Sequence, residues 1–344
     1  MPRGFADARG DPVKKAAVET RRPTNPAAEE ILGLYFPVLD HGFVSLVDYM
    51  GSDEDVERAA RVSYGYGTRR TSETRGLIRY LRRHRHTTPS EMVELKFHCA
   101  MPIFVARQWI RHRTANLNEY SGRYSLLPLL FYRPAPEHLQ AQSATNRQGR
   151  SGASLDAIYD EAVTRWERLR REAAETYEWL VQRDVARELA RIDLPLSTYT
   201  QWYWKIDLHN LFHFLAVRAD PHAQYEIRAY ANVMAGMLKR VAPLSFEAWV
   251  DYELAGAHLS RGELDAVRRL VQVAGDGVAA RAGASLGREE LARMGLSNRE
   301  IEELVMKLGA QPTIEAFDLD PSAARPAEEF ARIMEAAVPR VDRR

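Results

Sequence analysis

Cysteine and long apolar segments are scarce in this sequence of 344 residues. Cys99 is the single cysteine, which excludes an intrachain disulfide and is typical of a reducing compartment. No apolar run approaches the length of a membrane-spanning helix, and the first residues lack the apolar core of a signal peptide. We therefore expect a cytoplasmic protein with no membrane partner.

Neither sign of charge dominates, because 48 basic side chains stand against 47 acidic ones. This balance excludes a general nucleic-acid binder that works through net charge. Lysine contributes only six of the basic residues, so arginine is common and only clusters of arginine carry information. The sequence also has no GxGxxG or P-loop pattern. Any nucleotide must be held by a different device.

The most distinctive segment runs from Arg111 to Arg123, RHRTANLNEYSGR. The donor fork of arginine fits phosphate, and glycine lets a backbone N–H approach an anion, so the segment predicts one or two phosphate-bearing ligands. On a continuing helix, Arg111 and Arg113 would point about 200° apart. Either the helix ends there, or the two arginines serve different ligands or subunits. The alternative is a solvated basic helix end that its own dipole stabilises.

Two other patterns favour structural interpretations. Residues 69–86 carry seven arginines, but Leu77, Ile78 and Leu81 give this stretch an amphipathic helical pattern. A solvated outer face explains it better than nucleic-acid binding. His209 and His213 have the i, i+4 spacing of metal ligands, yet no Cys or carboxylate cluster completes a site, so we expect no metal.

The order of the predicted elements indicates an α+β fold, with a mixed sheet flanked by helices and a helical C-terminal appendage. A helix is expected to start at Pro26, and the period-two pattern of 92–99, which contains Cys99 as a core residue, predicts a strand, as does 198–206. Helices are expected at 53–63, 72–84, 102–112, 155–180 and 207–217. A further helical stretch is expected to end before Pro195, and another helix to run from Asp220-Pro221 to about 241. The predicted domains are a disordered tail (1–30), a catalytic domain (31–255) and a helical extension (256–344).

Several segments in order resemble the flavin-dependent thymidylate synthases, whose signature is Arg-His-Arg, seven residues, then Ser. Here the signature stands at Arg111 to Ser121. The other similar segments are AARVSYG (59–65), RHTTPSE (85–91), PIFVARQWIRHR (102–113), NEYSGRYS (118–125), LARIDLP (189–195) and LAVRADPHAQYEI (215–227). The resemblance covers about residues 31–255. Because the segments keep the family's order, chance does not explain them.

The resemblance implies an FAD enzyme that converts dUMP to dTMP, with 5,10-methylenetetrahydrofolate as carbon donor and NADPH as reductant. It also implies a homotetramer with active sites at subunit junctions. The positions similar to the family's dUMP contacts are Gln108, Arg111, Glu119, Tyr120, Ser121, Gly122, Arg123, Arg191 and Arg218, with Ser121–Arg123 supplied by a neighbouring subunit. Those similar to its FAD contacts are Ser63, His86, Thr88, Arg111, His112, Arg113, Thr114, Glu119, Asp207, His209 and His213. His86 resembles the histidine close to flavin and folate.

The chemistry of the reaction supports this resemblance. Methylation of carbon 5 of uracil needs a nucleophilic ring, which a Cys thiolate can generate by attack, but Cys99 is badly placed for this. We assign Arg218 to stabilise negative charge as the ring ionises. Ser121 has no evident paired base, so we expect it to position the substrate by hydrogen bonding. The rival hypotheses are a non-catalytic nucleotide- or nucleic-acid-binding protein and a family member that binds dUMP without turnover.

Overall fold

The computed structural model describes residues 22–63, 73–143, 149–275, 288–293, 301, 302, 304 and 316–340. The chain forms two compact units, one of residues 1–247 with 317–344 and the other of residues 248–316. This division differs from the predicted domains, because the C-terminal residues 317–344 belong to the unit that contains the sheet. Residues 1–21 of the predicted disordered tail lie outside the described residues. The helix α1 (Pro26–Glu29) forms inside the range 1–30, and it starts at Pro26 as predicted.

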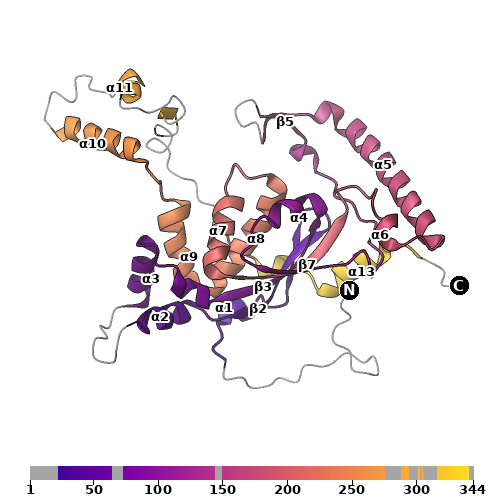
Figure 1. The fold of residues 1–344 in the computed structure, drawn as a ribbon, viewed down its shortest axis with the longest axis horizontal. Helices are drawn as coiled ribbons and strands as arrows, with labels where there is room; N and C mark the ends of the chain where they lie inside the picture. The colour runs from indigo at the N-terminus through magenta and orange to yellow at the C-terminus, as the bar shows by residue number, and fades with distance from the viewer. Residues whose placement is uncertain are drawn as a thin grey trace. The chain divides into compact units, whose positions relative to one another are not determined.

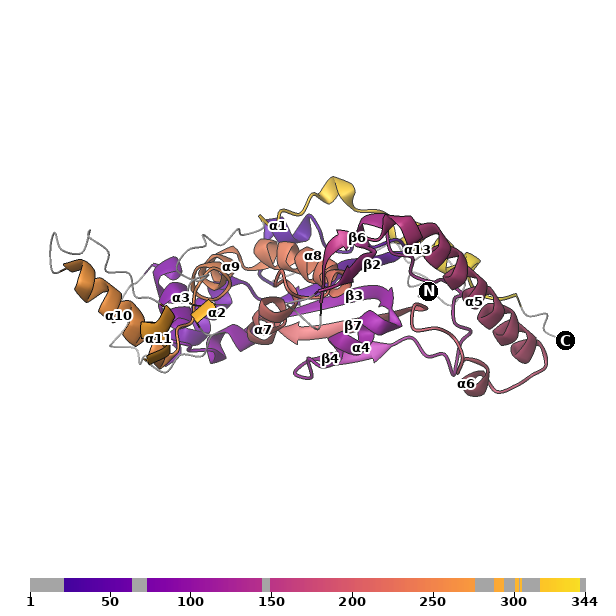
Figure 2. The ribbon, with the colours of Figure 1, turned by 90° about the horizontal axis from the view of Figure 1, so that it is seen from above.

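The first unit is built on a five-stranded sheet with strand order β1-β2-β3-β7-β4, and Figure 2 shows β3, β7 and β4 side by side. Its strands are β1 (Tyr35–Val38), β2 (Gly42–Met50), β3 (Glu94–Pro102), β7 (Tyr199–Asp207) and β4 (Asn116–Glu119). The two predicted strands are the central pair β3 and β7. The α+β class is confirmed, and the sheet that the sequence predicts as mixed is antiparallel in every strand pairing.

One face of the sheet carries an aromatic core. Phe97 pairs with Trp204 and Cys99 pairs with Trp202 across β3 and β7, so these side chains share a face. The ring of Trp109, from α4, lies 5.4 Å from Trp202 and 5.3 Å from Trp204. Cys99 has no exposed surface, and burial raises the pKa of its thiol well above the ordinary value. The prediction of Cys99 as a core residue is therefore confirmed.

Helices of the first unit flank this sheet, and Figure 1 shows α4, α7 and α8 together on one side of it. The remaining bounds are α2 (Asp53–Arg61), α3 (Thr74–Arg83), η1 (Thr88–Met92), α4 (Ile103–Trp109), η2 (Pro136–His138), α5 (Asp156–Gln182), α6 (Arg187–Ala190), α7 (Leu208–Arg218), α8 (Tyr225–Val241), η5 (Pro321–Ala323) and α13 (Ala327–Ala336). The strands β5 (Gln140–Gln142) and β6 (Arg150–Ser154) pair antiparallel and form a separate two-stranded sheet. On the other face of the sheet, Phe330 of α13 packs against Phe43 and Ala100.

Two helices differ from the predictions by more than two residues at one end. The helix predicted over 102–112 begins at Ile103, because strand β3 continues through Pro102. It ends at Trp109, and the chain turns after Ile110. The helix predicted from Asp220-Pro221 begins only at Tyr225. The Asp220 carboxylate instead accepts the backbone N–H of His222, which closes a turn before the helix.

The second unit is helical in its described part, with η3 (Val250–Leu254), α10 (Arg261–Gly275) and α11 (Arg288–Arg293), and α9 (Pro243–Trp249) spans the boundary between the units. Ser260 and Glu263 form a capping box at the start of α10. A small apolar cluster of Ala266, Leu291 and Leu304 lies inside this unit. Within the described part of the chain, no helix is both long and apolar enough to cross a membrane.

Candidate active site

The basic cluster begins where α4 stops. Arg111 and His112 lie in the turn after the helix, where the backbone N–H of His112 donates to the carbonyl oxygen of Trp109 at 3.0 Å. Arg113 lies beyond that turn, and both arginines are exposed. Of the two alternatives from the sequence, the structure shows that the helix ends before the arginines. The argument from a 200° separation on one helix therefore does not apply.

The imidazole of His112 is paired with Arg218 at the end of α7. The Nε of Arg218 donates to Nε2 of His112 at 3.0 Å, and the ring of His213 lies 5.9 Å from that of His112. Burial, with the nearby Arg218 and His213, lowers the pKa of His112 to about 4. At neutral pH, His112 is therefore a neutral acceptor at Nε2, with its proton on Nδ1.

Arg218 is a half-buried cation without a counter-ion among the described residues. Burial lowers the pKa of its guanidinium from the ordinary value, and no carboxylate of the described residues lies within ion-pair distance of it. Its hydrogen bond to the neutral His112 fixes the side chain but does not neutralise the charge. A desolvated guanidinium of this kind favours a bound anion or a group that gains negative charge.

The pKa of His112 predicts how the stability of the first unit depends on pH. The unfolded histidine binds its proton near pH 6.5, whereas the folded one binds it near pH 4. Since the unfolded state binds more protons in that window, the contribution of His112 to the free energy of unfolding is fully present above pH 6.5 and is lost as the pH drops towards 4. Replacing His112 with Gln should make the decline in Tm over this range shallower. Thermal melts of both proteins from pH 7.5 to 4 test this, and parallel curves would contradict it.

The second half of the signature forms a separate group around Gly122. The Ser121 hydroxyl accepts the backbone N–H of Arg123 at 3.3 Å, and no base among the described residues is bonded to that hydroxyl. A Cβ on the buried Gly122 would lie 3.0 Å from Nη1 of Arg191 and 3.0 Å from Cγ of Leu127, so a larger residue here requires these side chains to shift. Arg123 pairs with Glu188 on the surface at 2.8 Å. Ser121, Gly122, Arg123 and Arg191 are thus brought together within one chain.

The close approach at Gly122 gives a test of this group. Gly122→Ala should displace the side chains of Arg191 and Leu127 by a few tenths of an ångström, because a Cβ there would lie 3.0 Å from each of them. The resemblance implies that this group binds dUMP, and on that expectation the KM for dUMP should rise about tenfold, which corresponds to the loss of roughly one charge-assisted hydrogen bond. Steady-state kinetics, with Tm as a check on folding, measure this. An unchanged KM would mean that Arg191 does not bind substrate.

Strand β4 separates the two groups. Its residues pair with β7, and the backbone N–H of Tyr120 donates to the carbonyl oxygen of Gln201 directly after it. The Glu119 carboxylate accepts from the hydroxyl of Thr200 at 2.7 Å. No hydrogen bond or ion pair of the described residues joins 111–113 to 121–123. A single chain therefore presents two separate groups of candidate ligand-binding residues.

The positions that resemble flavin contacts lie on elements that touch one another. The turn η1, which contains Thr88 and follows His86, packs against α2 and α7. Ser63 lies just after α2, and α7 carries His209 and His213. The Nδ1 atom of His209 is buried with no hydrogen-bond partner among the residues that the structure describes. Thr114 is exposed beside Arg113.

Asp207 has a local role in the structure. Its carboxylate caps α7 by accepting the backbone N–H and the side-chain amide of Asn210, at 2.9 and 2.7 Å. Asp207 therefore sets where α7 begins, and α7 ends in Arg218 eleven residues later. No group of three or more His, Cys, Asp or Glu side chains in the described ranges could hold a metal ion.

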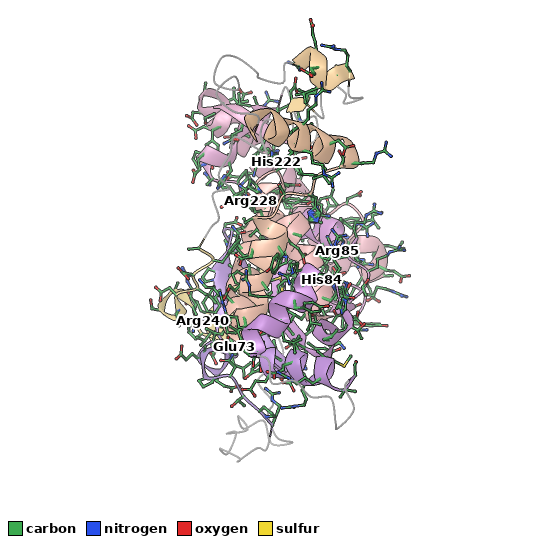
Figure 3. The ribbon with its side chains drawn as sticks, turned by 90° about the vertical axis from the view of Figure 1, so that its left-hand side faces the viewer. Glu73, His84, Arg85, His222, Arg228 and Arg240 are labelled. Carbon is green, nitrogen blue, oxygen red and sulfur yellow. The ribbon has the colours of Figure 1, made fainter. Side chains whose placement is uncertain are left out.

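The arginine-rich stretch is an amphipathic helix, as its pattern indicates. Ile78 and Leu81 of α3 are buried, while Arg75 and Arg79 pair with Glu247. His84 and Arg85 lie on the outside at the end of α3 (Figure 3). Residues 69–72 of the stretch lie outside the described residues. The described part thus supports a solvated outer face.

A buried carboxylate near the signature was missed at the sequence level. Glu226 is 2 % exposed, and it accepts hydrogen bonds from Arg150, Tyr132 and Gln224. Its Gln224 partner in turn bonds to Gln108. The only signal in the sequence is an acidic residue in the first turn of a helix, which is also typical of an ordinary helix N-terminus.

Comparison with known proteins shows to which family the chain belongs. The family model described as "Thymidylate synthase complementing protein" matches residues 45–244. A flavin-dependent thymidylate synthase of Gluconobacter oxydans is 59% identical over 256 residues, which cover 73% of this chain and 84% of the relative. A second one, from Ruegeria pomeroyi, is 54% identical and covers 73% of this chain and 85% of the relative. The chain belongs to the flavin-dependent thymidylate synthase family.

A solved structure of the family shares the fold. The UMP/dUMP methylase PolB from Streptomyces cacaoi, bound with 5-Br dUMP, is 34% identical with a TM-score of 0.58. The likeness covers 63% of this chain and 97% of that chain. As a flavin-dependent thymidylate synthase, the chain is an enzyme of the methyltransferase class.

Proposed function

We propose that this flavin-dependent thymidylate synthase methylates dUMP to dTMP, with 5,10-methylenetetrahydrofolate as carbon donor and NADPH as the source of reducing equivalents for bound FAD. The relatives named above support the flavin and the overall reaction, and the solved methylase was bound with a dUMP analogue. The observation that carries the proposal here is Arg218, a half-buried guanidinium that is fixed by His112 and has no carboxylate partner in the described part of the chain.

Arg218 acts on the base of the nucleotide. When the uracil ring becomes nucleophilic at carbon 5, negative charge develops on its imide and carbonyl atoms. A guanidinium that is already oriented and partly desolvated stabilises this charge more than one in bulk water. The neutral His112 keeps Nε of Arg218 occupied and leaves the two terminal nitrogens for the substrate.

Ser121, Gly122, Arg123 and Arg191 hold the phosphate end of dUMP. Two guanidiniums and an approachable backbone N–H are suited to a phosphate dianion. The Ser121 hydroxyl has no paired base, which favours positioning over nucleophilic attack. Cys99 is fully buried in the sheet and cannot act as the nucleophile either.

The residues assigned to FAD fit an anionic, planar ligand. The exposed cations Arg111 and Arg113 suit its diphosphate, and the unpartnered Nδ1 of His209 can bond to a polar group of the ring system. The bound flavin would supply hydride to the reaction. Ser63, His86, Thr88, Thr114, Glu119 and His213 complete the set that would hold it, with Asp207 positioning α7.

We extend the proposal to a homotetramer whose active sites lie at subunit junctions. The two groups on either side of β4 support it, because one chain does not join them by any hydrogen bond of the described residues. In such an assembly, Ser121–Arg123 of one subunit would complete the site that contains Arg111 and Arg218 of another. Light scattering at working concentration should then give a mass about four times that of the chain.

One anaerobic assay tests the proposal. The purified protein should be yellow, and turnover should require dUMP, methylenetetrahydrofolate and NADPH together. The gene should also rescue a bacterium that cannot make thymidylate. A colourless protein that fails this rescue would refute the proposal. A non-catalytic nucleic-acid binder would instead bind DNA or RNA with steep salt dependence, and an inactive family member would bind dUMP without turnover.

A further inference from the structure

A cavity of about 370 Å³ lies between α5 and the segment 129–133. Its volume falls within the range of small-molecule sites. None of its lining residues is among the candidate ligand-binding residues described above. One wall is a single face of α5, with the i, i+3, i+4 and i+7 spacing of Glu167, Arg170, Arg171 and Ala174.

The wall opposite α5 is held in place by hydrogen bonds. The backbone N–H of Leu129 donates to the carbonyl oxygen of Ala337 at 2.7 Å. The backbone N–H of Tyr132 donates to the carbonyl oxygen of Ser197 at 2.9 Å. Nη2 of Arg170 donates to the carbonyl oxygen of Tyr132 at 2.6 Å and so joins α5 to this wall. The cavity is therefore already formed before any ligand binds, which lowers the cost of ordering on binding.

Positive charge exceeds negative charge around the cavity. Three guanidiniums line it, those of Arg133, Arg170 and Arg171, and Glu167 is the one carboxylate in the lining. Glu167 lies 3.5 Å from Nη1 of Arg133. The nearby Asp40 carboxylate already accepts the backbone N–H of Arg133 at 2.8 Å. Three cations thus face two carboxylates, and at least one positive charge has no counter-ion among these residues.

The two arginines of α5 leave donors for a ligand. Arg170 is half-buried, and burial lowers the pKa of its guanidinium, which Asp40 and Glu167 oppose. Arg171 makes no hydrogen bond or ion pair with any residue that the structure describes. A phosphate ester presents three terminal oxygens, which several guanidinium forks can share, whereas a carboxylate presents two. The charge and the donor count therefore favour a phosphate.

We propose that this cavity is a second ligand site, which binds a small phosphate ester with an aromatic or apolar body. The phosphate contacts Arg133 and Arg171, which lie on opposite walls. The body of the ligand lies against the apolar side chains of Leu129 and Phe131 in the same lining. The inference goes beyond the proposed function and does not depend on it.

Calorimetric titration with phenyl phosphate tests the proposal. The flavin-loaded, full-length enzyme is first saturated with dUMP, so that the candidate active site is occupied. We expect saturable binding that is about fivefold tighter than that of inorganic phosphate, because the ring buries apolar surface against Phe131. Arg171→Met should weaken phenyl phosphate binding about tenfold, through the loss of a charge-assisted hydrogen bond. Arg168→Met is the matched control, because Arg168 is exposed on α5 outside the cavity, and it should change the affinity less than about twofold.

A substitution of opposite sign separates a specific site from structural damage. Glu167→Gln removes the carboxylate from the lining and releases Arg133, so phenyl phosphate should bind about threefold more tightly. The inference is overturned by an absence of saturable binding, by equal losses in Arg171→Met and Arg168→Met, or by weaker binding to Glu167→Gln. Equal affinities for inorganic phosphate and phenyl phosphate would overturn the assignment of an ester. If the wild type does not bind dUMP, the proposed function fails, and the same titrations without dUMP still decide this inference.

Discussion

Replacing Arg218 with alanine should reduce dTMP formation by at least about 10²–10³-fold, the range found when one preorganised donor to a developing negative charge is removed. The bound flavin should remain largely in place. The Arg218 side chain makes one hydrogen bond, to His112, among the described residues, and no ion pair of those residues depends on it. The loss should appear in kcat as well as in kcat/KM, because the charge develops only as the reaction proceeds.

The measurement combines anaerobic turnover with the flavin absorbance of the purified variant. Arg165→Ala is a matched control, since Arg165 lies on the exposed face of α5 and pairs with Glu161 on the same helix. It should retain wild-type turnover. Arg218→Lys should recover little activity, because lysine keeps the charge but loses the planar fork. Loss of flavin from Arg218→Ala would show that the residue belongs to the cofactor site instead.

Gly42→Ala should have the largest effect on stability. A Cβ at this position, the first residue of β2, would overlap the hydroxyl of Tyr230 and lie 2.7 Å from the carbonyl oxygens of Ala100 and Val38. The two carbonyls belong to paired strands and cannot withdraw without breaking the sheet. We expect a loss of at least about 3 kcal/mol in the free energy of unfolding, or a fall in Tm of roughly 6–12 °C.

Gly76→Ala is the matched control for this experiment. Gly76 lies inside α3, and a Cβ there would meet nothing within 4 Å. Alanine is the better helix former, so this variant should be more stable by about 0.5–1 kcal/mol. Thermal melts of both variants suffice. Equal Tm values for Gly42→Ala and the wild type would contradict the packing described at the start of β2.

The predictable elements are those with a clear local pattern. The alternation from Leu95 to Cys99 marks β3, and the amphipathic repeat of residues 155–180 marks α5. Strand β1 was missed because it is only four residues long and contains Pro37, which is tolerated at the edge of a sheet. Strand β2 was missed because it is buried over most of its length and so does not alternate.

The sequence by itself determined the Arg-His-Arg to Ser signature, the core position of Cys99 and the family, because these depend on residue types at fixed spacing. Only the tertiary structure decided what each side chain contacts. His112 and Arg218 are 106 residues apart, and Gln108 and Gln224 are 116 apart. They meet because α4, α7 and α8 pack around one aromatic core, and local periodicity encodes which face of a helix is buried but not which helix covers it.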